Sequence, residues 1–332
     1  MLTKKELYQY TGDVSQLFYA RPYRLCGGRA EGMLAADVNN GAGLCFTVLA
    51  DRAMDIARLS YRGVNFAFAT KAGLASPAYY DGSGDGWLKT FGGGFLTTCG
   101  LTQAGSPCES DGEALGLHGS ISAVPAEDLV CETDMDAETP EIRLRGKMRS
   151  GQLFGRSLWM TREYRMRAGE NKIYISDTVE NRTGNPCPYM ILYHFNLGYP
   201  LLDEDAMFIT SASFVRSRDD IAKAGEDRRA LFQRPELNFR EQVYYYKSAV
   251  AENGQSYGGL YNDKLRMGVR IWSDPAQLPH LVQWKNPGAG DYVMGIEPSN
   301  CYPEGREKQK EYGLDIIEPY GRRVQELCIE IV

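Results

Sequence analysis

Short strand-like runs recur along almost the whole chain. Most of them alternate apolar and polar residues with a period of two, which is the pattern of a half-buried β-strand. The runs span 43–50, 141–148, 157–166, 171–181, 189–197, 265–273, 292–298 and 324–332. Helical periodicity is confined to the first dozen residues and part of 216–232. The sequence therefore predicts an all-β fold.

Stretches rich in glycine, asparagine and proline separate these runs, as expected for turns. No linker, composition shift or internal repeat divides the 332 residues. We therefore expect a single domain over residues 1–332. Its predicted architecture is a large two-sheet antiparallel β-sandwich with a few short helices, in which one concave sheet can hold a ligand.

Composition excludes several classes of partner. The formal net charge of −6 argues against binding to nucleic acid or to an anionic membrane surface. The amino terminus has no continuous apolar stretch after its lysines, so we expect a cytoplasmic protein. The eight cysteines are scattered without a CxxC spacing, which favours reduced thiols. Neither metal-ligand spacing nor a phosphate-binding glycine loop is present, so we predict no metal and no cofactor.

Only three histidines occur, and each has a structural as well as a functional interpretation. His118 precedes Gly119 in LGLHGSIS, at a strand or turn edge where the backbone can approach a ligand. His194 lies in the apolar run YMILYHFNLGYP, where an imidazole either is a hydrogen-bonded core residue or acts as an acid. His280 follows a proline-containing loop and fits a surface position, so we leave it outside the site.

One carboxylate stands out. Glu297 ends the apolar run YVMGIEP, and Pro298 stops the strand ladder directly after it. Such a side chain either points to solvent or, if buried, requires a partner. The segment alone leaves both alternatives open.

Several segments together resemble the galactose mutarotase-like, or aldose 1-epimerase, superfamily. LHG at 117–119 is similar to its histidine-glycine segment, and HFNLGYP at 194–200 to the strand that carries its proton-donating histidine. GIEPSN at 295–300 resembles its catalytic-glutamate segment, and the stretch 269–284 resembles the one that precedes it. DRAMDI at 51–56 resembles the DRxMDI segment of its bacterial, DUF4432-type branch. The order of the segments also agrees.

This resemblance implies roles for individual residues. Glu297 would be the base at the anomeric hydroxyl and His194 the acid at the ring oxygen, while His118 would donate a hydrogen bond to the sugar. We expect His194 to rest as an imidazolium, because a nearby carboxylate raises the pKa of histidine. Trp284 is either a platform for the sugar ring or a core residue. The other expected substrate contacts are Gln283, Asn300 and Arg52.

Two departures from the superfamily pattern bear on specificity. Thr-Thr-Cys occupies 97–99, where the superfamily has an arginine after its glycine-rich segment, and Ser-Asn occupies 299–300, where Gln is commoner. Arg52 either supplies the missing guanidinium or forms an ion pair with Asp51 or Asp55. Both departures leave a galactose specificity unsupported.

The resemblance thus predicts a sugar mutarotase or epimerase that interconverts anomers by acid–base ring opening. Its expected partner is a small-molecule sugar, and the sequence is compatible with a monomer or a homodimer. The alternative is a non-catalytic carbohydrate-binding or sensing protein on the same scaffold. A lyase or hydrolase that acts on oligosaccharides is a weaker third option.

Overall fold

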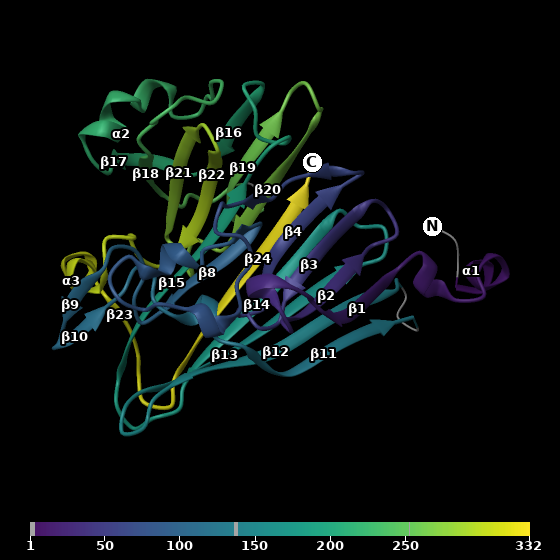
Figure 1. Ribbon diagram of the computed structural model, residues 1–332, viewed down its shortest axis with the longest axis horizontal. Helices are drawn as coiled ribbons and strands as arrows, with labels where there is room; N and C mark the ends of the chain where they lie inside the picture. The colour runs from purple at the N-terminus through teal and green to yellow at the C-terminus, as the bar shows by residue number, and fades with distance from the viewer. Residues whose placement is uncertain (1–3, 136–138, 252) are drawn as a thin grey trace.

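The alternating runs form antiparallel sheets in the computed structural model (Figure 1). The structure describes residues 4–135, 139–251 and 253–332. All eight predicted runs coincide with strands, which confirms the all-β prediction. The predicted helical segments contain α1 (Lys4–Tyr10) and α2 (Asp220–Ala224). A third short helix, α3 (Arg306–Gln309), was not predicted.

The largest sheet has eight strands. In spatial order they are β11 (Ala126–Asp134), β12 (Glu141–Gly151), β13 (Ser157–Arg167), β14 (Lys172–Asn181), β24 (Arg322–Ile331), β20 (Met267–Ser273), β19 (Ser256–Asn262) and β16 (Ala206–Thr210). In β12, Ile142 and Leu144 are buried while Arg143 and Arg145 are exposed. Period-two alternation thus gives this sheet one apolar face and one polar face.

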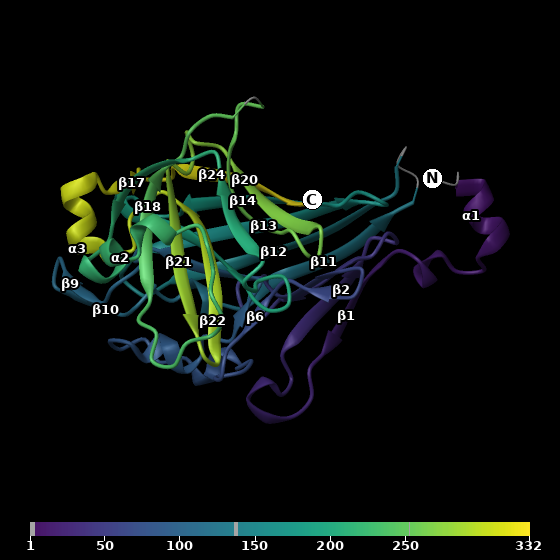
Figure 2. The same ribbon diagram turned by 90° about the horizontal axis from the view of Figure 1, so that it is seen from above.

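Two further sheets cover the apolar face (Figure 2). The first contains β1 (Tyr19–Arg24), β2 (Leu34–Asn39), β3 (Leu44–Leu49), β4 (Asp55–Tyr61) and β5 (Val64–Asn65). The second runs β17 (Ser213–Ser217), β18 (Gln242–Lys247), β21 (His280–Gly288), β22 (Asp291–Ser299), β15 (Cys187–Leu197) and β23 (Asp315–Ile317), with β8 (Leu96–Leu101) also paired to β15. One hydrophobic core contains side chains from all three sheets, as in a two-layer sandwich.

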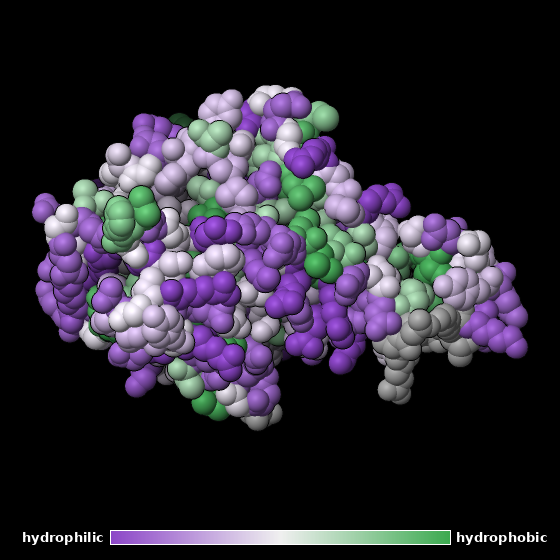
Figure 3. Space-filling model, turned by 90° about the horizontal axis from the view of Figure 1, so that it is seen from below, coloured by the Kyte–Doolittle hydropathy of each residue, from purple (hydrophilic) through white to green (hydrophobic). Residues whose placement is uncertain are grey.

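Short elements complete the fold. They are the strand pairs β6 (Phe68–Ala69) with β7 (Gly93–Gly94) and β9 (Cys108–Ser110) with β10 (Glu113–Leu115). No helix within the described residues combines the length and apolar character needed to cross a membrane. Hydrophilic residues predominate on the face seen in Figure 3, with small hydrophobic areas between them.

A buried ionic network connects the sheets behind β8. Arg162 of β13 contacts Asp177 of β14 at 2.6 Å and Asp55, the first residue of β4, at 2.9 Å. The Thr98 hydroxyl donates to Asp55 at 2.6 Å, and the Tyr193 hydroxyl donates to Asp177 at 2.8 Å. Asp55 belongs to the DRAMDI segment, so this segment fixes β4 against β8 and β15. It thereby helps to position the strand that carries His194.

Candidate active site

A cavity of about 330 Å³ lies against the seven-stranded sheet, within the range of small-molecule sites. The polar side chains that line it are Asp85, Ser106, His118, His194, Arg218, Glu241 and Glu297. Its aromatic lining consists of Trp87, Phe91 and Trp284. Four of the seven predicted site residues, namely His118, His194, Trp284 and Glu297, therefore share one cavity.

His194 and Glu297 face each other from neighbouring strands. Phe195 of β15 pairs with Ile296 of β22, and this antiparallel register places His194 opposite Glu297. His194 Nε2 lies 3.3 Å from Glu297 Oε1, and the two side chains are only 6% and 3% exposed. Gly295 is needed beside them, because a Cβ there would lie 2.7 Å from Glu297 Oε1. The solvent-pointing alternative for Glu297 is wrong.

Burial sets the protonation of this pair. Desolvation, reinforced by the charge of Glu241, raises the pKa of Glu297 to about 8. Desolvation and the nearby His118 lower the pKa of His194 to about 3. The pair therefore rests as a carboxylic acid beside a neutral imidazole at neutral pH. The expected resting imidazolium is wrong, because burial of the imidazole lowers the pKa of His194 instead of raising it.

His118 enters the cavity from a turn. Its backbone adopts a left-handed φ of +57°, and its Nδ1 accepts a hydrogen bond from the Gly105 N–H at 3.2 Å. Burial lowers the pKa of His118 to about 4, so its ring is neutral at pH 7. With Nδ1 as the acceptor, the ring proton resides on Nε2. His118, 5.7 Å from His194 between ring centroids, can thus donate a hydrogen bond to a ligand.

Trp284 forms an aromatic wall next to the histidine. Its ring centroid lies 5.3 Å from that of His194, with an interplanar angle of 76°. The indole N–H donates to Glu241 Oε2 at 2.7 Å, and Glu241 Oε1 pairs with Arg218 Nη2 at 2.9 Å. Arg218 also contacts Asp219 at 2.9 Å. This chain of contacts fixes the tryptophan within the cavity.

Arg218 and Glu241 were missed by the sequence analysis. Arg218 follows β17 and Glu241 precedes β18, so the two residues are brought together by the pairing of those strands. Trp87 was also missed, because its segment reads as a glycine-rich turn. Its ring stacks on Phe91 at 4.3 Å and tilts against His118 at 4.7 Å. No local sequence signal could have located the ion pair, because the contact depends on the pairing of β17 and β18.

Arg52 lies outside this cavity. Its buried guanidinium donates to the backbone carbonyls of Ala75 at 2.9 Å and Thr90 at 3.3 Å. Asp55 pairs with Arg162, and Asp51 accepts a hydrogen bond from a backbone N–H. The substrate-contact and ion-pair interpretations of Arg52 are both replaced by a role in holding two loop segments.

Gln283 and Asn300 also point elsewhere. Gln283 is adjacent to Trp284 on β21, so the alternation of a strand sends it to the opposite face, where it accepts from the Tyr246 hydroxyl at 2.8 Å. Asn300 accepts from the Ile191 N–H at 2.7 Å and donates to the Tyr189 carbonyl at 3.2 Å. Both side chains are structural in this fold. Within the described residues, no cluster of three or more His, Cys, Asp or Glu side chains could hold a metal ion.

The fold is that of the galactose mutarotase-like proteins. The chain belongs to the family described as a domain of unknown function, DUF4432, whose model matches residues 30–331. A search of curated proteins found no match.

Solved structures agree on the fold. A candidate aldose 1-epimerase from Klebsiella pneumoniae is 28% identical, with a TM-score of 0.90 over 96% of this chain and 86% of that one. A galactose mutarotase-like protein from Clostridium acetobutylicum is 12% identical, with a TM-score of 0.67 over 96% and 99% of the two chains. A galactose 1-epimerase from Lactobacillus acidophilus is also 12% identical, with a TM-score of 0.60 over 95% and 99%.

Proposed function

We propose that this protein is a sugar mutarotase or epimerase, with His194 and Glu297 as its acid–base pair. The observation that carries the proposal is their buried 3.3 Å contact at a cavity that also contains His118 and Trp284. An acid and a base within reach of one ligand are the minimum requirement for opening a sugar ring. The described relatives on the same scaffold support the same reaction class.

The number of protons that the pair holds matches what ring opening requires. Ring opening removes the proton from O1, breaks the C1–O5 bond and adds a proton to O5. Protonated Glu297 and neutral His194 together hold one transferable proton, and transfer across 3.3 Å gives a carboxylate and an imidazolium. In that second form Glu297 takes the O1 proton and His194 protonates O5. Rotation about C1–C2 and reclosure then produce the other anomer and restore the pair.

The charges of the cavity favour an uncharged sugar. Within the described residues, Arg218 is the only lysine or arginine that lines it. Asp219 and Glu241 already pair with this guanidinium at 2.9 Å each. A phosphate or carboxylate on the substrate would have to compete with both, and would also meet Asp85. We therefore infer a non-phosphorylated substrate.

Exchange spectroscopy by proton NMR tests the proposal on a panel of aldoses, ketoses and uronates. We expect faster α/β exchange for at least one neutral sugar and none for the uronates. The absence of acceleration for every sugar would reject the proposal. Tight binding without acceleration would instead select the non-catalytic sugar-binding alternative. One observation favours that alternative: Thr97, Thr98 and Cys99 stand where the superfamily has an arginine.

A further inference from the structure

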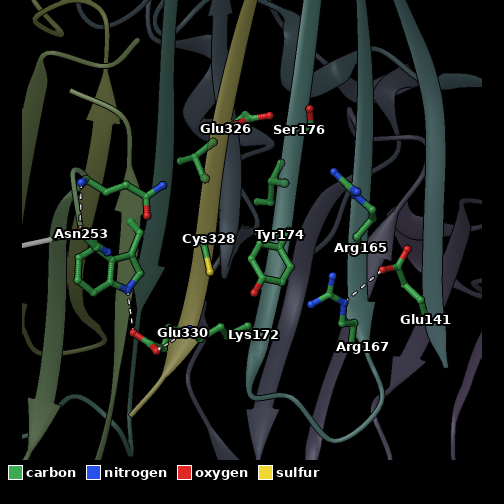
Figure 4. A pocket seen from close by; sticks show the side chains of 14 residues that line it. Glu141, Arg165, Arg167, Lys172, Tyr174, Ser176, Asn253, Glu326, Cys328 and Glu330 are labelled. Atoms are coloured by element: carbon green, nitrogen blue, oxygen red, sulfur yellow. Dashed lines mark hydrogen bonds and ion pairs between the residues drawn. The ribbon is translucent and has the colours of Figure 1, made fainter. Parts of the chain in front are cut away.

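A second cavity, larger than the candidate active site, lies on the polar outer face of the eight-stranded sheet. It measures about 460 Å³ (Figure 4). Strand register aligns four of its side chains in one row, because Arg165 pairs with Tyr174, Tyr174 with Cys328, and Cys328 with Trp272. Figure 4 shows Arg165, Tyr174 and Cys328 side by side on neighbouring strands. We call this cavity the outer trough.

The two aromatic rings frame the trough. Tyr174 and Trp272 are both half-buried, and the smaller Cys328 lies between them. One intervening strand separates the rings, so they lie about 10 Å apart at ordinary strand spacing. That distance is close to the span of two linked pyranose units. A row of this kind offers two stacking surfaces with a hollow between them.

Trp272 is held in place by charged neighbours. Its indole N–H donates to Glu330 Oε2 at 2.8 Å, and Glu330 Oε1 pairs with Lys172 at 3.1 Å. The ring also packs on Tyr257 at a centroid distance of 4.9 Å. A ring fixed in this way loses little conformational entropy when a ligand stacks on it.

Basic and acidic side chains line the outer trough in equal numbers. Three basic side chains face three acidic ones, and Arg167 and Lys172 pair with Glu141 and Glu330, respectively. Such a surface matches an uncharged polar ligand better than an anion, because an anion would have to displace these carboxylates. Glu326 and Asn253 add hydrogen-bonding groups for hydroxyls at the rim.

We propose that the outer trough binds a neutral oligosaccharide of at least two pyranose units, which lies across the strands and stacks on Tyr174 and Trp272. Aromatic rings present an apolar face to the C–H groups of a pyranose, and the flanking carboxylate and amide groups hydrogen-bond its hydroxyls. The site is distinct from the cavity of His194 and Glu297 and does not depend on catalysis there.

Indole NMR signals test this proposal on the full-length protein, which has four tryptophans. The probes are neutral hexasaccharides of β-1,4-linked glucose, xylose or mannose. We expect at least one of them to shift the Trp272 signal, assigned through Trp272→Phe, and to do so equally in Glu297→Gln. Absence of a shift with all three, or a shift confined to Trp87 and Trp284, would overturn the proposal.

One substitution and its control test whether the trough residues contribute to binding of the hexasaccharide. Tyr174→Ala should weaken binding of the hexasaccharide about tenfold or more, which is read from the Trp272 signal. Trp159→Ala is the matched control, because Trp159 lies on the outer face of the neighbouring strand β13 but does not line the trough. Equal affinity in Tyr174→Ala and wild type, with both proteins folded by circular dichroism, would also contradict the proposal.

Discussion

The His194 imidazole and the Glu297 carboxyl group lie 3.3 Å apart, and burial shifts their pKa values in opposite directions. The pKa of Glu297 rises to about 8 because its carboxylate is desolvated, and that of His194 falls to about 3 because its imidazolium is desolvated. Between these values the pair holds one proton. This single proton links the geometry of the site to its expected pH dependence.

The pH–rate profile should therefore have a broad plateau. The pair loses its proton as the pH rises through the pKa of Glu297, so kcat/KM should fall above about pH 8. At acidic pH, activity should persist well below pH 6. The pair takes up a second proton, on His194, only as the pH approaches the lowered pKa of this histidine. Exchange rates measured from pH 4.5 to 10 check this. An acidic limb near pH 6.5 would contradict the lowered pKa of His194.

Glu241 should affect catalysis in two ways, by holding the Trp284 indole and by raising the pKa of Glu297. Glu241→Gln keeps an oxygen that can accept from the Trp284 N–H but removes the charge that raises the pKa of Glu297. We expect the alkaline limb to move to lower pH with little change in KM. Glu241→Ala also releases the indole and should lower kcat/KM about tenfold. Identical pH profiles in Glu241→Gln and wild type would exclude this electrostatic role.

Breaking the buried network around Arg162 should destabilise the sandwich strongly. Arg162→Met leaves Asp55 and Asp177 buried without their guanidinium partner, which should cost about 3–5 kcal/mol of unfolding free energy. Lys71→Met is the control, because its pair with Asp291 is exposed and should contribute less than about 1 kcal/mol. Urea denaturation measures both. A loss below about 1 kcal/mol in Arg162→Met would refute the structural role of DRAMDI.

Glu297 should destabilise the protein at alkaline pH. Its pKa is about 8 when folded against an ordinary value of 4.5, so the folded state binds more protons between these values and stability falls as pH rises through them. Glu297→Gln removes this penalty. Its Tm advantage over wild type should grow from pH 5 to pH 9, by roughly 2–4 °C for each kcal/mol relieved. A constant difference across this range would contradict the raised pKa of Glu297.

Local sequence patterns predicted the strands because alternation directly reports which face of a strand is buried. The same alternation explains one error, since Gln283 and Trp284 are consecutive on β21 and cannot both face the cavity. Arg52 was misassigned because the sequence does not reveal that backbone carbonyls from 75 and 90 would satisfy its guanidinium.

The rest of the site depends on contacts between distant segments. Arg218 and Glu241 meet only because β17 and β18 pair, and neither residue lies in a recognisable motif. The protonation of His194 and Glu297 likewise depends on burial, which their flanking residues do not specify. The resemblance located the pair, whereas the structure was needed to find that burial shifts the two pKa values in opposite directions.

The most direct test is the α/β exchange rate of the best neutral sugar in three variants. His194→Gln and Glu297→Gln should each lower the enzymatic rate at least about a hundredfold, because each removes one partner of the proton transfer. His280→Gln should retain the wild-type rate, because His280 does not line the cavity. Wild-type exchange in either His194→Gln or Glu297→Gln would contradict the acid–base assignment.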